Sequence, residues 1–103
     1  MPTVRVLPDG PVLRARPGQT IMEAAREQGY YWPTTCGGQG ICTSCTCAVA
    51  EGEEGLEPMG PSERRTLYAE FGEAQVRARR LRLACQARVR GDVAVQKRGV
   101  RPA

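Results

Sequence analysis

Histidine and asparagine are absent from this sequence of 103 residues, and aromatic side chains make up only 5% of it. The lack of histidine excludes a His-ligated haem, a Rieske centre, a mixed Cys/His zinc site and a Ser-His-Asp triad. The chain is long enough for one modest core, so we expect a single domain over residues 1–103. Because aromatic residues are few, we expect something other than apolar packing to help stabilise it.

The sequence also lacks a long apolar run. Residues 41–50 form its longest weakly polar stretch, which is too short to cross a bilayer, and the first residues alternate like a strand rather than forming a signal segment. The five cysteines are an odd number. We therefore expect a reducing, cytoplasmic setting with no membrane association, in which clustered cysteines bind a metal or act as redox centres rather than forming disulfides.

Charge is unevenly distributed along the chain. Residues 74–103 contain nine Lys or Arg against Asp92 alone, although the net charge of the whole chain is only +4. No base-stacking aromatic residue lies among these cations, so we expect a solvated strand face and no nucleic-acid binding. An acidic partner protein would be attracted to this surface.

Periodicity predicts a small α+β domain in which a mixed sheet is covered by one main helix, with a short second helix. Val4, Val6, Val12 and Leu13 are the expected core contacts of the first hairpin. Thr20 and Glu23 form a capping-box signature. The expected elements are an opening hairpin (3–7 and 11–16), a helix (20–28), a strand (46–50), a helix starting at 61, and a final hairpin (81–89 with 93–95) whose inward face includes Cys85.

Four cysteines show a spacing that points to a metal centre. Five residues separate Cys36 from Cys42, two separate Cys42 from Cys45, and 39 separate Cys45 from Cys85. The glycine-rich segment 37–41 can wrap around an inorganic group and direct backbone N–H groups at sulfur. A structural zinc module and a thioredoxin-like dithiol remain alternatives, although zinc usually takes two short Cys-Cys knuckles and only one occurs here.

The run Cys-Gly-Gly-Gln-Gly-Ile-Cys-Thr-Ser-Cys, followed by Leu-Ala-Cys-Gln at 83–86, resembles the plant- and adrenodoxin-type [2Fe-2S] ferredoxins. The first gap of five residues and the extra Cys47 are similar to the adrenodoxin and iron-sulfur-assembly branch. The resemblance covers nearly the whole chain, and it implies a β-grasp (ubiquitin-like) fold. It also implies one [2Fe-2S] cluster on Cys36, Cys42, Cys45 and Cys85.

The resemblance further implies an electron-transfer protein and not an enzyme. Such a monomeric carrier would pass single electrons from a ferredoxin reductase to an acceptor protein, either a P450 or other oxygenase or the iron-sulfur assembly machinery. Two other features have simpler expected roles. Cys47 is expected to be a core residue, and at least one of Tyr30, Tyr31 and Trp32 is expected to pack beside the cysteine loop.

Overall fold

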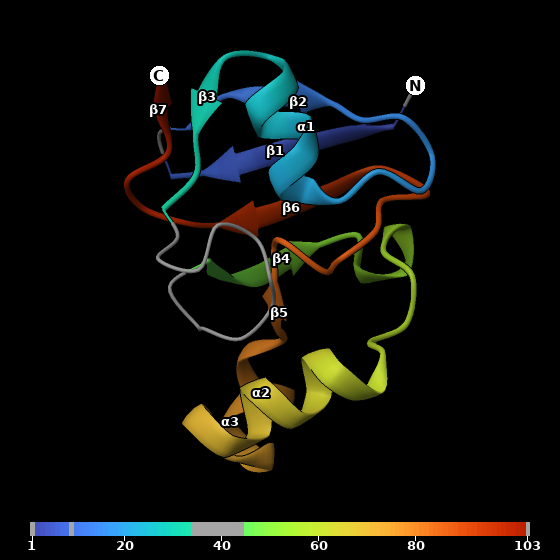
Figure 1. The fold of residues 1–103 in the computed structure, drawn as a ribbon, viewed down its shortest axis with the longest axis vertical. Helices are drawn as coiled ribbons and strands as arrows, with labels where there is room; N and C mark the ends of the chain where they lie inside the picture. Colours follow the sequence, from blue (N-terminus) through green and yellow to red (C-terminus); the bar gives the residue numbers. More distant parts are fainter. Residues whose placement is uncertain (1, 9, 34–44, 103) are drawn as a thin grey trace.

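The computed structural model describes residues 2–8, 10–33 and 45–102, so Cys36 and Cys42 lie outside the described residues. A five-stranded mixed sheet forms the centre, and a two-stranded sheet lies beside it (Figure 1). The strands are β1 (Thr3–Leu7), β2 (Val12–Arg14), β3 (Tyr30–Tyr31), β4 (Thr46–Glu51), β5 (Leu81–Leu83), β6 (Val93–Gln96) and β7 (Arg101–Pro102). The helices are α1 (Ile21–Glu27), the 3₁₀ turn η1 (Glu53–Gly55), α2 (Pro61–Phe71) and α3 (Glu73–Arg79).

The main sheet has the strand order β2-β1-β6-β4-β5. Strands β1 and β6 pair in parallel at its centre, and the other neighbours are antiparallel. With α1 lying across this sheet, the arrangement is a β-grasp fold, as expected. The opening hairpin is confirmed as β1 and β2. Of its expected core contacts, Val4, Val6 and Leu13 are buried, but Val12 is 61% exposed because it lies on the outer face of an edge strand.

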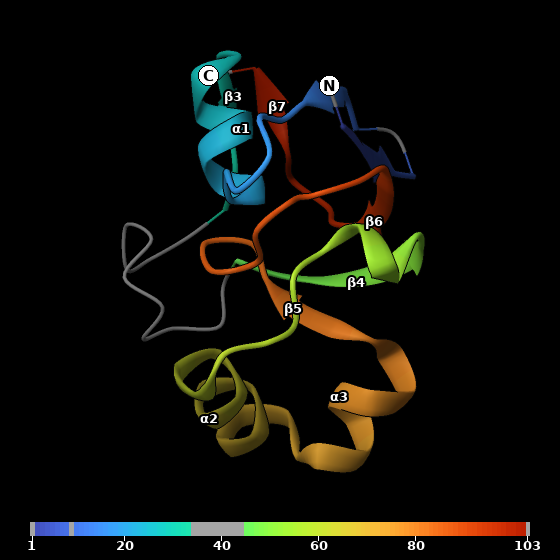
Figure 2. The same cartoon turned by 90° about the vertical axis from the view of Figure 1, so that its right-hand side faces the viewer.

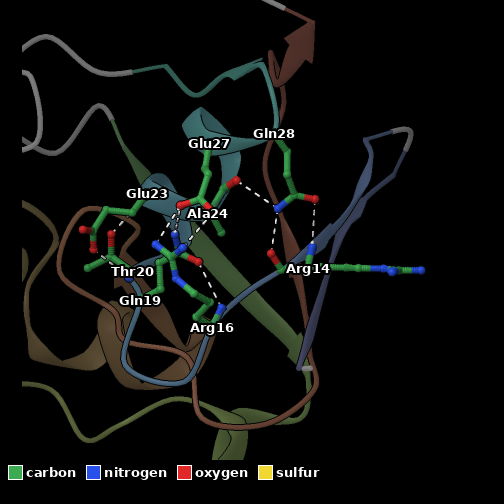
Figure 3. Close-up of polar contacts among 8 residues, drawn as sticks. All are labelled: Arg14, Arg16, Gln19, Thr20, Glu23, Ala24, Glu27 and Gln28. Carbon is green, nitrogen blue, oxygen red and sulfur yellow. Dashed lines mark hydrogen bonds and ion pairs between the residues drawn. The ribbon is translucent and has the colours of Figure 1, made fainter.

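Helix α1 begins where the sequence predicts. The Thr20 hydroxyl accepts a hydrogen bond from the Glu23 N–H, and the Glu23 carboxylate accepts one from the Thr20 N–H, which completes the capping box (Figure 3). Hydrogen bonding of the Glu23 carboxylate to Thr20, above all to its backbone N–H, lowers the pKa of Glu23. Gly29 follows the helix with a φ of +84°, a conformation that favours glycine.

The opposite end of the molecule holds two helices where the sequence analysis expected one. Figures 1 and 2 show α2 and α3 together beyond β5, away from α1. Among the helices that the structure describes, α2 is the longest, so it is not the short second helix of the prediction. Part of the expected strand-like basic face belongs instead to α3, which contains Arg77 and Arg79. That part of the prediction is wrong.

The predicted final hairpin is also wrong. Strand β5 pairs with β4, and β4 lies between β5 and β6 in the sheet. After Leu83 the chain turns instead of continuing as a strand, and Cys85 lies in that turn. The alternating apolar positions are nonetheless buried, because the turn and the segment that follows pack against the core. Within the described residues, no helix has both the length and the apolar composition needed to cross a bilayer.

Candidate metal centre

Two of the four predicted ligands meet in the described part of the chain. The sulfur atoms of Cys45 and Cys85 lie 3.4 Å apart, although 40 positions separate them in the sequence. Cys45 is fully buried and Cys85 is 8% exposed. The first precedes β4 and the second follows β5, so the antiparallel pairing of these two strands brings the two thiols together.

Backbone hydrogen bonds fix the turn that contains Cys85. The Leu83 carbonyl accepts from the N–H groups of Gln86 and Ala87 at 2.9 and 2.8 Å. The first turn of α1 binds the same segment, since the Met22 N–H donates to the Ala84 carbonyl and the Ile21 N–H to the Ala87 carbonyl, both at 3.1 Å. Helix α1 therefore uses two of its otherwise unsatisfied N–H groups to hold the Cys85 turn in place.

The backbone at Cys45 is held from a second direction. Its carbonyl accepts a hydrogen bond from the indole Nε1 of Trp32 at 3.1 Å and one from the Ala84 N–H at 3.4 Å. Trp32 is 1% exposed, which confirms the expectation that one of the three aromatic residues packs beside the site. Its bond to the Cys45 carbonyl was not predicted, because nothing in the local sequence indicates the partner.

A buried ion pair anchors β5 just before the Cys85 turn. The Arg82 guanidinium donates to both carboxylate oxygens of Glu63, at 2.7 and 3.1 Å, and the Leu83 N–H donates to the same carboxylate at 2.9 Å. Glu63 and Arg82 are only 3% and 7% exposed. Sequence reasoning missed this pair; its only signal is an isolated arginine between the apolar residues Leu81 and Leu83.

Cys47 is a core residue, as predicted. It is 2% exposed, and its Sγ lies 3.7 Å from the carbonyl oxygen of Arg82. Burial, together with the smaller effect of the neighbouring Cys45, raises the pKa of this thiol to about 12. A neutral thiol of this kind behaves as a small apolar side chain.

The geometry of Cys45 and Cys85 suits two thiolates on one metal ion. Their 3.4 Å separation is far beyond the disulfide length of about 2.05 Å. Two sulfurs bound at about 2.3 Å to one tetrahedral ion would lie about 3.8 Å apart, which is within a small side-chain adjustment. The residues therefore fit a thiolate-ligated metal centre, and fold and site together define a β-grasp protein with cysteine ligands.

Comparison with known proteins shows the family. Residues 4–90 match the model of the 2Fe-2S iron-sulfur cluster binding domain, and the chain belongs to this family. A 2Fe-2S ferredoxin of Escherichia coli strain K12 is 36% identical over 89 residues, which cover 86% of this chain and 77% of that protein. The chain therefore carries a single [2Fe-2S] cluster and is an electron-transfer protein rather than an enzyme.

Solved structures agree with this result. The ISC-like [2Fe-2S] ferredoxin FdxB of Pseudomonas putida superposes with a TM-score of 0.72 at 31% identity, covering 94% of this chain and 92% of that one. The Amycolatopsis cytochrome P450 reductase GcoB gives a TM-score of 0.77 at 34% identity. That match covers all of this chain but 28% of GcoB, so the same fold is also found as part of a larger reductase.

Breaking the buried ion pair is expected to destabilise the fold strongly. Glu63→Ala would leave the Arg82 charge and the Leu83 N–H buried without their partner, which costs about 3–5 kcal/mol. We expect the midpoint of thermal unfolding, followed by far-UV circular dichroism at one scan rate, to fall by at least about 10 °C. Glu73→Ala is the control, because it breaks the exposed Glu73–Arg77 pair and should cost less than about 1 kcal/mol. Equal shifts would contradict this role of Glu63.

Removing the indole N–H of Trp32 is expected to loosen the site. Trp32→Phe takes away the shorter hydrogen bond to the Cys45 carbonyl, at a cost of about 1–3 kcal/mol. We expect faster release of iron to a chelator and an altered visible circular dichroism spectrum of the loaded protein. Tyr31→Phe is the matched control, because Tyr31 is 40% exposed and its ring contact with Arg101 is retained. Iron release as slow as in the unmodified protein would refute the role of Trp32.

Proposed function

We propose that this chain is a cytoplasmic, monomeric one-electron carrier that consists of a single domain over residues 1–103. It would take electrons from a ferredoxin reductase and deliver them to an acceptor protein. The observation that carries the proposal is the meeting of the Cys45 and Cys85 sulfurs at a buried position in a [2Fe-2S] ferredoxin fold. The proposed acceptors are of two kinds: a P450 or other oxygenase, and the iron-sulfur assembly machinery.

We propose Cys36, Cys42, Cys45 and Cys85 as the four ligands. The cluster, when bound, accepts and releases one electron. The protein's part is to hold the thiols and keep water away from them, which the burial of Cys45, Cys85 and Trp32 supports. Because the ligands come from distant parts of the chain, the centre would also link the cysteine loop to the Cys85 turn and supply the additional stabilisation that the small core requires.

Two relatives give different support for the partners. The Pseudomonas putida relative is described as ISC-like, which favours a role related to iron-sulfur assembly. The Amycolatopsis relative is a cytochrome P450 reductase, which favours electron delivery to an oxygenase. Both are compatible with a reductase as the electron source, so the acceptor has to be identified by measuring electron delivery.

Serine substitutions are expected to separate ligands from the core cysteine. Cys85→Ser should reduce the iron and sulfide content of the anaerobically purified protein by more than half and change its visible spectrum, because an alcohol is a poorer ligand than a thiolate. Cys47→Ser should retain about two irons and two sulfides per chain. Iron, sulfide and zinc are measured on the same samples. Equal losses in both variants would overturn the proposed ligand set, and zinc in place of iron would contradict the iron-sulfur cluster.

Electron transfer is expected to proceed from the reductase through this protein. The loaded protein should be bleached by NAD(P)H only when a ferredoxin reductase is present, and it should then recover its colour as an oxygenase P450 or an assembly complex is reduced. Stopped-flow absorbance follows both steps. The cluster-free protein is the control and should support neither. If the protein is bleached but its colour recovers with neither the oxygenase P450 nor the assembly complex, both proposed acceptors are contradicted.

A further inference from the structure

A groove with a volume of about 460 Å³ lies beside the strand that follows Cys45. Strand β4 forms one wall, and the rest is formed by the end of α3, the start of β5, the end of β6 and the residues that follow β1 and β6. The described residues that line it are Pro8, Thr46, Cys47, Ala48, Arg79, Leu81, Gln96, Lys97 and Arg98. We call it the basic groove, because three of these residues are cations and none of them is acidic.

Two of the three cations of the groove, Arg79 and Arg98, differ from the neighbouring arginines of the chain in their ion pairing. Arg79 and Arg98 are exposed and form no ion pair within the described residues. Three other arginines of the same stretch of sequence are paired, as Arg77–Glu73, Arg80–Glu53 and Arg82–Glu63. The fold therefore pairs three of the four arginines in residues 77–82 with glutamates, whereas Arg79 lines the groove together with Lys97 and Arg98.

The groove also continues past Lys97 and Arg98. A second hollow of about 330 Å³ shares Pro8, Lys97 and Arg98 with it and extends to Val100. Lys97 is partly buried between the two, and burial lowers the pKa of its ammonium group. A cation in a concave, partly desolvated site produces a stronger local potential than one on a flat surface.

The position of the groove relative to the cluster site matters for electron transfer. Thr46, which lines the groove, directly follows Cys45 in the chain, and Cys47 and Ala48 continue the same wall. The Thr46 hydroxyl is buried and has no hydrogen-bond partner within the described residues. A protein seated in the groove would therefore contact the strand that directly follows the proposed ligand Cys45.

We propose that the basic groove is the docking site for an acidic face of the protein that accepts the electron. Carboxylates around the acceptor's redox centre would pair with Arg79, Lys97 and Arg98, placing that centre near Cys45. This inference rests on the proposed function, and it adds to it the charge of the acceptor's contact surface and the position of that contact on this chain. Attraction of this kind mainly raises the association rate, and salt suppresses it.

The test compares two double variants that both lower the net charge from +4 by four units. Arg79→Glu/Arg98→Glu reverses the charge of the groove. Arg14→Glu/Arg26→Glu is the matched control, because Arg26 and Arg79 each lie in the last turn of a helix and Arg14 is exposed on the edge strand β2. Figure 3 shows the Arg14 side chain extending away from the polar contacts around α1. Far-UV circular dichroism and cluster absorbance check that each variant folds and is loaded.

The probe is the soluble domain of cytochrome b5, an acidic haem protein, and cytochrome c is the basic comparison. One electron leaves the dithionite-reduced protein, freed of excess reductant, and converts ferric haem to ferrous haem. At about 20 mM salt we expect the groove variant to reduce cytochrome b5 at least about tenfold more slowly than the unmodified protein, and the control variant less than about threefold more slowly. At about 0.5 M salt the difference should disappear. Cytochrome c should show no such loss with the groove variant.

Other results would overturn the proposal. Equal rates for the two variants, with clusters intact, would refute the docking site and leave the electron carrier standing, whereas a protein without a reducible cluster would refute the proposed function itself. Short duplex DNA that binds the unmodified protein but not the groove variant, without any change in the rate of cytochrome b5 reduction, would assign the groove to nucleic acid instead.

Discussion

The position of Cys85 depends on hydrogen bonds from three separate parts of the chain. Helix α1 donates to the carbonyls on either side of it, the Cys45 carbonyl accepts from Ala84, and Glu63 binds the backbone of Leu83. The local hydrogen bonds of the turn are therefore supplemented by groups from α1, from Cys45 and from α2. Because these groups come from distant parts of the chain, the metal site and the fold are specified together.

Features that depend on neighbouring residues could be predicted from the sequence. The capping box of Thr20 and Glu23 and the β1–β2 hairpin were both predicted correctly, because their partners lie only a few positions apart. The cysteine spacing indicated the family for the same reason, since three of the four residues fall within positions 36–45 of the sequence. The distance between Cys45 and Cys85, in contrast, follows from the pairing of β4 with β5.

Features that depend on distant partners were missed. The alternation of apolar and polar residues over 81–89 indicates that every second residue is buried. It does not indicate which strand pairs with this segment, and a turn that packs on the core gives the same pattern. The position of β4 between β5 and β6 therefore cannot be predicted from the local sequence. The burial of Arg82 cannot be predicted locally either, because it requires the Glu63 carboxylate from α2, 19 positions earlier in the chain.

The same reasoning applies to charge. A count along the sequence treats the cations of residues 74–103 as one basic region, yet an ion pair cancels most of the field of the arginine it contains. Only the fold decides which arginines meet a glutamate. Arg77, Arg80 and Arg82 do, whereas Arg79 and Arg98 line a groove beside β4. The surface available to an acidic partner is thus smaller than composition indicates, and it lies beside β4, the strand that follows Cys45.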